Sequence, residues 1–329
     1  MMSIIDFTVL IQEGMKMKKL SREAFEEIRF WVYRNARQIE LAIWEFEFEG
    51  GGCDAVLSAL GKYQNADGGF GNALEPDCWN PASSPYTTLN AISRLKTVGF
   101  TDVGHPIYQG IIRYLDSGEH RTDSGWLFNI PSNNGFARAP WWTYDAKANE
   151  HEHLGVTAGL VCFILQYVDN NAPLYNLAFA FAEKLLARFN EPGQKGDMGL
   201  GGYSQLLDVI NQLGLAGRLD ISRLSSELKR LVDDAIERDE SKWGEYRVRP
   251  SQFIKSPDSP YYADNEGIVQ AELDYLIDTR PVNGVWNISW HWHDNYAKYP
   301  EEFAISKNWW KADLVVDRIK FLRNFNRLE

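Results

Sequence analysis

A glycine-rich turn constrains the fold of this chain more than any other feature. Residues 64–71 read Gln-Asn-Ala-Asp-Gly-Gly-Phe-Gly and follow a short apolar run. Glycines in such a turn permit positive φ angles and a close approach of two backbone segments. Gln64 and Phe70 are placed to tie one helical hairpin to the next, through a hydrogen bond and a planar packing surface. The turn therefore predicts a body built from repeated helical hairpins.

Four looser copies of this turn share its combination of glycine with an aromatic residue. They are residues 123–126, 199–203, 242–246 and 283–286. Their spacing is uneven, and it lies near or above the range expected of regular repeat arrays. Helical patterns flank each copy, as a hairpin repeat requires.

Apolar residues at helical spacing predict about ten helices in consecutive pairs. Ser21 is the expected N-cap of a long first helix that ends at the glycines of residues 50–52, and Ser84-Pro85 marks the start of another helix. The run 157–168 is apolar on nearly every side, which predicts a helix shielded by others. Alternation over residues 45–49 is interpreted as a frayed helix end, because an isolated strand cannot bury its face. This pattern leaves an open solenoid and a closed double ring as alternatives.

Composition limits the partners of the chain. The net charge of −11 argues against binding to nucleic acid or to an anionic membrane surface. No uninterrupted apolar stretch approaches the length needed to cross a bilayer. The three cysteines lie far apart and predict neither a disulfide framework nor a thiolate metal cluster, so a cytoplasmic location is expected.

No convincing linker divides the 329 residues, although that length could hold two domains. We predict a single domain over residues 18–329. Residues 1–17 are expected to form an N-terminal extension that is either disordered or upstream of a true start at Met15 or Met17.

The stretch 60–71 resembles the glutamine-tryptophan type repeat of the terpene cyclase and protein prenyltransferase β-subunit superfamily. Residues that carry the resemblance are Gln64, Asp67, Gly68, Gly69 and Phe70. Residues 283–292 look like a later copy, and a looser similarity, to a bacterial branch of the superfamily, extends over most of the chain. The resemblance implies an all-α fold, an α/α toroid of about five to six helical hairpins whose inner and outer helices surround a central cavity.

Two catalytic motifs of that superfamily are missing from this sequence. The Asp-x-Asp-Asp acid motif of class II cyclases does not occur, which argues against squalene-type cyclisation. Prenyltransferases hold zinc with an aspartate and a cysteine two residues later, whereas Asp77 here is adjacent to Cys78. No cofactor and no metal is therefore predicted.

Glu75 and Asp77 are the first candidates for catalysis. They lie between the glycine turn and the helix start at Ser84-Pro85, where a toroid exposes a loop at one mouth of its cavity. Paired carboxyl groups serve as general acid and base when burial separates their pKa values. The alternative is that they cap backbone amides at a helix N-terminus. His153 and Asp264 are further catalytic candidates.

Histidines and acids suggest weaker metal sites. His151 and His153 form one pair and His291 and His293 another, and zinc accepts such ligands. Hydrogen-bonded loop histidines are the favoured interpretation, because a one-residue gap puts both side chains on one face only in extended backbone. Residues 233–237 imitate the magnesium motif of terpene synthases, but a solvated charged face of an amphipathic helix explains them.

Aromatic residues are the expected lining of the cavity. Their π faces could steady a carbocation or stack on a sugar ring, although many will instead pack between helices. The substrate-binding candidates are Trp79, Trp141, Trp142, Tyr262, Trp290 and Trp292.

These features leave three functions open. The leading hypothesis is a monomer or homodimer that binds a small apolar, isoprenoid-like ligand in a central cavity and acts on it with acid assistance. It requires a mostly apolar cavity with one or two acids. The second is a carbohydrate hydrolase, lyase or epimerase of the (α/α) barrel type, with opposed carboxyl groups. The third is a noncatalytic protein-binding scaffold with a filled or narrow centre.

Overall fold

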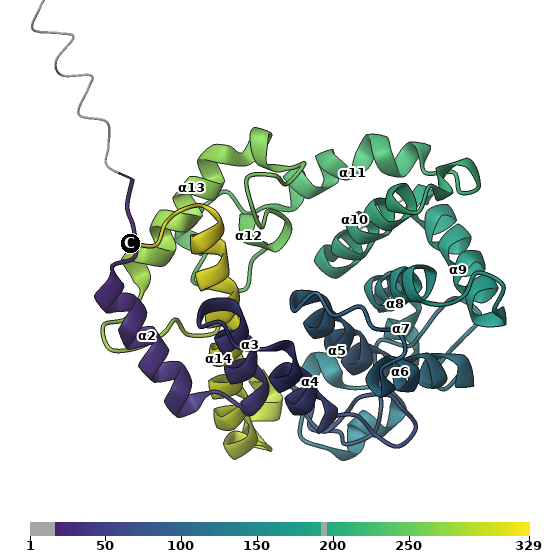
Figure 1. The fold of residues 1–329 in the computed structure, drawn as a ribbon, viewed down its shortest axis with the longest axis horizontal. Coiled ribbons are helices and arrows are strands. Elements are labelled where there is room, and N and C mark those ends of the chain that lie inside the picture. The colour runs from purple at the N-terminus through teal and green to yellow at the C-terminus, as the bar shows by residue number, and fades with distance from the viewer. Residues whose placement is uncertain (1–16, 192–195) are drawn as a thin grey trace, which may run out of the picture.

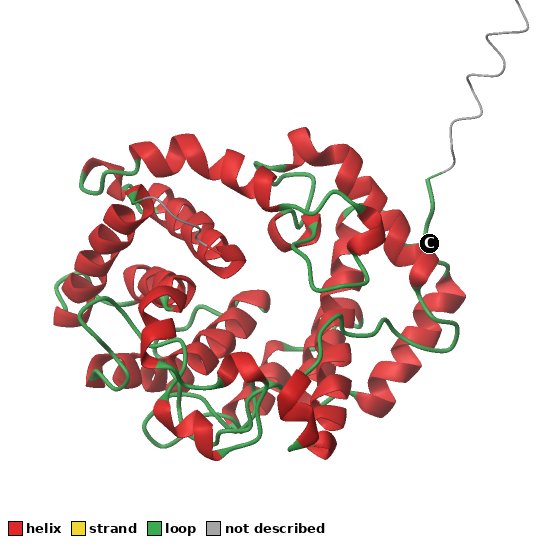
Figure 2. Ribbon diagram, turned by 180° about the vertical axis from the view of Figure 1, so that it is seen from behind, coloured by secondary structure: helices red, strands yellow, loops and turns green. Residues whose placement is uncertain are grey.

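The computed structural model describes residues 17–191 and 196–329, and this part of the chain is all-helical. Figure 2 shows helices joined by loops, and no strand occurs among the described residues. The predicted all-α class is therefore confirmed. Residues 1–16 of the predicted N-terminal extension lie outside the described residues.

The longer helices and short 3-10 helices follow one another along the whole described chain. They are α2 (Arg22–Asn35), α3 (Gln38–Phe48), α4 (Cys53–Gly61), α5 (Pro85–Thr97), α6 (Pro106–Ser117), η1 (Pro131–Gly135), η2 (Pro140–Trp142), α7 (Ala146–Glu152), α8 (Leu154–Tyr167), α9 (Pro173–Asn190), α10 (Gly196–Gln212), η3 (Leu215–Gly217), α11 (Ser222–Ala235), η4 (Glu240–Lys242), α12 (Pro250–Phe253), α13 (Tyr262–Thr279), η5 (His293–Ala297) and α14 (Pro300–Asn324).

Several neighbouring helices lie one at the periphery and one nearer the middle of the molecule. Figure 1 shows α2, α9, α11 and α13 along the outside of the ribbon, with α3, α5, α8, α10 and α14 nearer its middle. The last helix contacts α2 and α3, the first two helices that the structure describes. Backbone bonds join Leu20 to the C-terminal residues: Leu20 N–H donates to Arg327 O at 2.8 Å, and Glu329 N–H donates to Leu20 O at 3.1 Å. The C-terminal helix therefore packs directly against the start of the described chain.

Helix α8 is the shielded helix that the sequence predicts. Every residue from Leu154 to Leu165 is buried, and α5, α9 and α10 all contact the helix. Small residues bring α8 and α10 together, since a Cβ on Gly202 would lie 3.1 Å from the Cα of Gly155. A helix that is apolar all round is stable only when neighbours cover each face, and here they do.

The opening turn makes the contacts expected of it. Gly68 has φ +95°, and a Cβ there would lie 2.1 Å from the carbonyl oxygen of Gly110 in α6. Gln64 Nε2 donates to Ile107 O, also in α6, at 3.0 Å. The predicted tie between one hairpin and its neighbour is thus confirmed for the hydrogen bond of Gln64.

One of the looser copies repeats this geometry closely. Phe70 N–H donates to Thr88 Oγ1 in α5 at 3.1 Å, and Trp126 N–H donates to Thr157 Oγ1 in α8 at 3.1 Å. Gly125, just before Trp126, has φ +149°, and a Cβ there would meet Thr157 Oγ1 at 2.2 Å. A glycine followed by an aromatic residue therefore joins a loop to the next inner helix at two places in the chain.

Two sequence predictions about these elements are wrong. The expected long first helix is two helices, because Ala36 and Arg37 are extended and Arg37 becomes the N-cap residue of α3. The copy at residues 199–203 is not a turn but part of α10, where Gly202 serves helix packing. The alternating residues 45–49 do lie at a helix end, since α3 runs to Phe48.

Candidate functional site

The candidate site is a cavity of about 640 Å³ beside the loop that follows the glycine turn. Most of its lining is aromatic or aliphatic, and two carboxyl groups of that loop face it. The described lining residues are Glu75, Asp77, Tyr86, Phe128, Trp141, Trp142, His151, Glu152, Leu154, Gly155, Gly196, Met198, Gly199, Tyr246, Trp290, His293 and Trp310. Ligand cavities in proteins commonly have about 300–1,000 Å³, so this one has the size of a small-molecule site.

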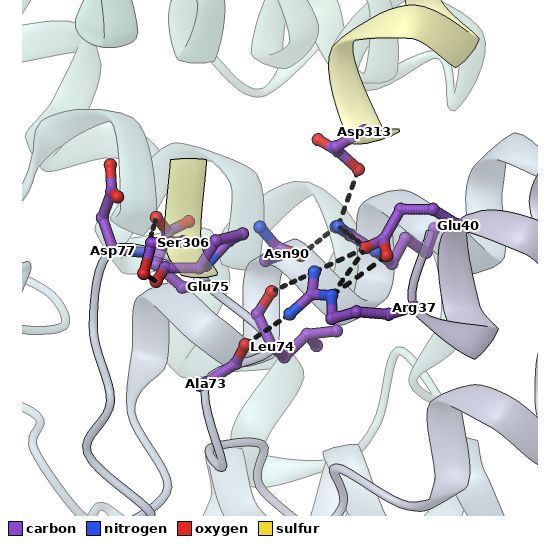
Figure 3. Close-up of polar contacts among 11 residues, drawn as sticks. Arg37, Glu40, Ala73, Leu74, Glu75, Asp77, Asn90, Ser306 and Asp313 are labelled. Carbon is purple, nitrogen blue, oxygen red and sulfur yellow. Dashed lines mark hydrogen bonds and ion pairs between the residues drawn. The ribbon is translucent and has the colours of Figure 1, made fainter. Parts of the chain in front are cut away.

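The loop that carries both acids is held on its N-terminal side by Arg37. Asn72 and Ala73 each have φ +57°, which turns the chain sharply after the glycine turn. Arg37 Nη1 donates to Ala73 O at 2.6 Å and Nη2 to Leu74 O at 3.3 Å, as Figure 3 shows. The buried guanidinium of Arg37, the N-cap residue of α3, therefore fixes the two residues that precede Glu75.

Two other segments hold the loop on its C-terminal side. Ser306 Oγ of α14 donates to Pro76 O at 2.5 Å, and Ala139 N–H donates to Asp77 O at 2.8 Å. Elements distant in sequence thus clamp the main chain on both sides of the carboxyl groups. Such support keeps reactive side chains in one position without help from a ligand.

Asp77 is a buried carboxylate whose two oxygens accept hydrogen bonds from indoles. Trp290 Nε1 donates to Oδ2 and Trp292 Nε1 donates to Oδ1, each at 2.8 Å. Burial raises the pKa of Asp77 to about 6, and the bonds from Trp292 and Trp290 oppose that rise because they favour the charged form. The indole N–H of Trp310 also lowers the pKa of Asp77, although it forms no hydrogen bond in the described structure. Asp77 is therefore an anion at neutral pH.

Glu75 is equally buried but has far fewer partners. Its Oε1 accepts a bond from Asp77 N–H at 3.3 Å, and its Oε2 is buried without a hydrogen-bond partner among the described residues. Burial, followed by the charge of Asp77, raises the pKa of Glu75 to about 8. Glu75 is therefore a neutral acid at pH 7 next to an anion. No helix begins between residues 71 and 84, so the alternative that these acids cap a helix is wrong.

Aromatic rings form the wall opposite and around the acids. The ring of Trp142 stacks on Phe128 with centroids 4.9 Å apart and meets Tyr86 edge-on at 4.4 Å. Trp290 and Trp310 form another edge-on pair at 5.2 Å. Trp142 Nε1 and Trp310 Nε1 are buried without hydrogen-bond partners in the described structure. Together with Glu75 Oε2, three residues that line this cavity therefore carry a buried polar atom without a partner in the described structure.

Three of the six predicted substrate-binding residues line this cavity, namely Trp141, Trp142 and Trp290. Trp292 lies behind them, fully buried, and supports Asp77. Trp79 stacks on Trp309 at 5.3 Å, and Tyr262 packs against Phe325 at 5.3 Å. Neither of these two is among the lining residues, so the structure places both in helix packing.

Two predicted catalytic residues are also placed outside the cavity. His153 Nδ1 lies 3.1 Å from Thr157 Oγ1, and burial lowers its pKa. Asp264 forms an ion pair with Lys229 at 2.5 Å, and its side chain is 57% exposed. Position therefore favours Glu75 and Asp77 over these residues.

The two histidine pairs meet at the cavity, although only one member of each lines it. His151 of α7 and His293 of η5 are lining residues, whereas His291 packs against Phe303 at 4.5 Å. Among the described residues, no group of three or more His, Cys, Asp or Glu side chains could hold a metal ion.

The acidic motif at residues 233–237 lies on α11 and its end, away from the cavity lining. Asp233 accepts a bond from Asn265 Nδ2 at 2.6 Å, and Asp234 pairs with Arg230 at 2.7 Å. Both acids thus have protein partners, which agrees with a charged helix face.

Sequence reasoning missed several lining residues, of which Tyr86 is the most informative. It is the second residue of α5, directly after the Ser84-Pro85 signal that marks the helix start. Burial raises the pKa of the Tyr86 phenol well above 10, and the charge of Glu75 raises it further. The sequence predicts that a helix starts at Ser84-Pro85, close to the cavity. The tyrosine directly after this helix start was therefore the signal that could have identified Tyr86 as a lining residue.

No helix in the described part of the chain is long and apolar enough to span a membrane. Comparison of the chain with protein-family models, with curated proteins and with solved structures finds no match.

Proposed function

We propose that this protein is an α/α toroid of the terpene cyclase and prenyltransferase type that binds a small apolar molecule in a central cavity. Three observations support it: the glycine-aromatic contact repeats at Phe70 and Trp126, the last helix packs on α2 and α3, and a large cavity lies beside α5, α8, α10 and α14. Analogy of fold alone is weak support for an activity. The proposal for the chemistry therefore depends on the acid pair.

In this proposal Glu75 is the general acid and Asp77 is the anion that stabilises positive charge. The single observation that carries the proposal is Glu75 Oε2, a buried and unpaired oxygen of a carboxyl group that burial keeps protonated at neutral pH. A raised pKa near the working pH makes a carboxyl group an effective proton donor. Asp77 and the faces of Trp142, Trp290 and Trp310 would lower the energy of a developing cation.

The lining favours an apolar substrate over a sugar. None of the described lining residues is an Asn, Gln, Ser or Thr. Sugar-binding sites need several hydrogen-bonding side chains to replace the water around each hydroxyl group, because an unpaired buried hydroxyl is costly, and here Asp77 already accepts bonds from Trp290 and Trp292. A scaffold protein, in turn, has no need for an open cavity with an unpaired acid. We therefore favour an isoprenoid-like substrate that Glu75 protonates, because this function accounts for both the aromatic lining and the unpaired acid.

The proposal is tested by finding and turning over the bound molecule. Organic extraction of freshly purified protein, followed by mass spectrometry, should yield an apolar metabolite in stoichiometric amount. Glu75→Gln should bind that compound but convert it about 10²–10⁴ times more slowly, since it removes one general acid. Glu227→Gln, a change of the same kind at an exposed ion pair of α11, is the matched control and should turn over normally. A Glu75→Gln protein with wild-type turnover, or extraction of a sugar instead, would overturn the proposal.

A further inference from the structure

A second, smaller cavity adjoins the first. It has about 170 Å³, roughly a quarter of the volume of the main cavity, and Tyr246 and Trp290 line both. The small cavity differs from its neighbour in charge. Its ionisable lining residues include the cations Arg247, Arg249, Lys255 and Arg318 and the carboxyl groups of Glu272 and Asp317.

The two carboxyl groups are fewer than the cations and offset only part of their charge. Glu272 is occupied by Ser251, whose Oγ donates to Oε1 and whose N–H donates to Oε2, each at 2.7 Å. Asp317 is an exposed residue, so solvent screens its interaction with the cations. Among the described residues, the ion pairs of this cavity's cations are confined to Arg247, which pairs with Glu245 at 2.7 Å and Glu237 at 3.8 Å. Arg249, Lys255 and Arg318 therefore leave an excess of positive charge.

Arg318 shows the lack of a counter-ion most clearly. Its Nη1 is buried with no hydrogen-bond partner among the described residues, and its guanidinium carbon lies 5.4 Å from the centre of the Trp286 ring. Burial, together with the charge of Arg249, lowers the pKa of Arg318 to about 10. A buried cation without a hydrogen-bonded counter-ion is costly, and an incoming oxoanion would offset that cost.

We propose that the small cavity binds the oxoanion group of the substrate whose apolar body occupies the main cavity. This inference rests on the proposed function, and it makes the substrate an amphipathic acid: an apolar chain or ring system that ends in a carboxylate or a phosphate monoester. A cavity of about 170 Å³ has room for a carboxylate or phosphate head group. An arginine binds either group, so Arg318, whose Nη1 has no hydrogen-bond partner among the described residues, supplies the recognition that both anions share. Arg249, whose Nη2 already donates to Trp243 O, adds positive charge.

The test compares three probes with equal tails: decanoate, decyl phosphate and 1-decanol. Isothermal titration with the full-length protein should show that at least one anion binds about tenfold or more tightly than the alcohol. The better anion distinguishes a carboxylate from a phosphate substrate. Arg318→Gln should remove most of that preference, and Lys255→Gln, at an exposed position that tolerates change, should reduce it. Arg230→Gln, at an exposed pair on α11, is the matched control and should leave it unchanged.

The outcomes separate this inference from the proposed function. Equal affinity for all three probes, or a preference that survives both Arg318→Gln and Lys255→Gln, would refute the anion site and leave the apolar cavity standing. Arg318-dependent binding of inorganic phosphate without any binding of tailed probes would support the anion site and refute the proposed function. Anion preference that persists in Glu75→Gln protein would show that the head-group site does not depend on the acid.

Discussion

Two glutamates of this protein are buried to the same degree but in opposite electrostatic settings. Glu40 in α3 and Glu75 in the loop after the glycine turn are each 1% exposed. Glu40 accepts bonds from Arg37 Nε at 3.2 and 3.0 Å, and Arg94 Nη2 lies 3.7 Å away. Glu75 accepts one backbone bond, and its other oxygen has no partner in the described structure. The charge of Glu40, which lies between helices, is therefore compensated by two arginines, whereas Glu75 at the cavity has no cationic partner among the described residues.

The two settings are joined by a single side chain. Figure 3 shows Arg37 between Glu40 and the carbonyl oxygens of Ala73 and Leu74, directly before Glu75. Arg94 extends the compensated cluster to Asp313 in α14 at 2.9 Å. The cluster of Arg37, Glu40, Arg94 and Asp313 thus serves as the base on which the uncompensated acid is positioned.

The largest expected effect is a difference in stability between two separate variants, Glu40→Gln and Glu75→Gln. We expect Glu40→Gln to lower the free energy of unfolding at pH 7 by about 3–5 kcal/mol, because it leaves Arg37 buried without its carboxylate. Glu75→Gln should instead raise it, by at most about 3 kcal/mol, since at pH 7 the folded wild type keeps a proton that the unfolded chain has lost, and glutamine removes that cost. Urea denaturation followed by circular dichroism measures both.

The exposed Glu227→Gln substitution is the control and should cost less than about 0.5 kcal/mol. Equal destabilisation by Glu40→Gln and Glu75→Gln would break the comparison, because it would mean that Glu75 is also ionised and paired.

The second expected effect is a dependence of stability on pH that Glu75→Gln removes. Folding raises the pKa of Glu75 from 4.5 to about 8, so between these values the folded state holds a proton that the unfolded state has lost. Wild-type stability should therefore fall, relative to that of Glu75→Gln, as pH rises from about 4.5 to 8, by at most about 1.4 kcal/mol per pH unit. Urea midpoints of both proteins at several pH values test this.

Above pH 8 the difference between the two proteins should stay constant. A difference that grows with pH in the opposite direction would show that the folded state favours the charged form of Glu75.

Local features of this fold were predictable from the sequence, and contacts between distant residues were not. Gln64 and Gly68 act within one turn and its neighbour, so the motif revealed their role. The break between α2 and α3 was missed because the bonds that Arg37 makes to Ala73 and Leu74 lie 36 and 37 residues away. An apolar pattern shows where a helix can form but not where a distant carbonyl group stops it.

The same division applies to the candidate site. Glu75 and Asp77 were found because they directly follow a recognisable turn. The hydrogen bonds around them could not be predicted, since the indole that donates to Asp77 Oδ2 belongs to Trp290, 213 positions later in the chain. Asp264 was placed wrongly beside them because sequence alone does not show which face of α13 is buried, and that face carries Asn265 and Val269 instead.

A smaller effect is expected from Ser306, which clamps the loop from α14. Its Oγ donates to Pro76 O and accepts from Trp79 Nε1 at 2.9 Å. Ser306→Ala should cost about 1–3 kcal/mol, because it leaves a buried indole N–H and a buried carbonyl with fewer partners. It should also slow turnover by loosening the acid loop, with little change in ligand affinity. A loss of stability with wild-type turnover would show that Arg37 and Ala139 position the acids without Ser306.

The smallest expected effect is a pH-dependent shift of two NMR signals, which reports directly on the protonation of Asp77. Indole N–H resonances of Trp290 and Trp292 in ¹⁵N-labelled protein should shift together with pH, with one midpoint near the pKa of about 6 that burial gives Asp77. Trp290→Phe assigns the two signals, and Asp77→Asn should make both independent of pH.

Trp243 is an internal control for that titration. Its Nε1 donates at 2.9 Å to the backbone carbonyl oxygen of Glu237, and a backbone carbonyl group does not change its protonation state with pH. A common midpoint near 6 would place a charged Asp77 beside a neutral Glu75 throughout the neutral range. A midpoint close to the ordinary value of 3.8 would instead mean that the two indole bonds outweigh burial. Asp77 would then hold a permanent charge, and only Glu75 would change its protonation state near neutral pH.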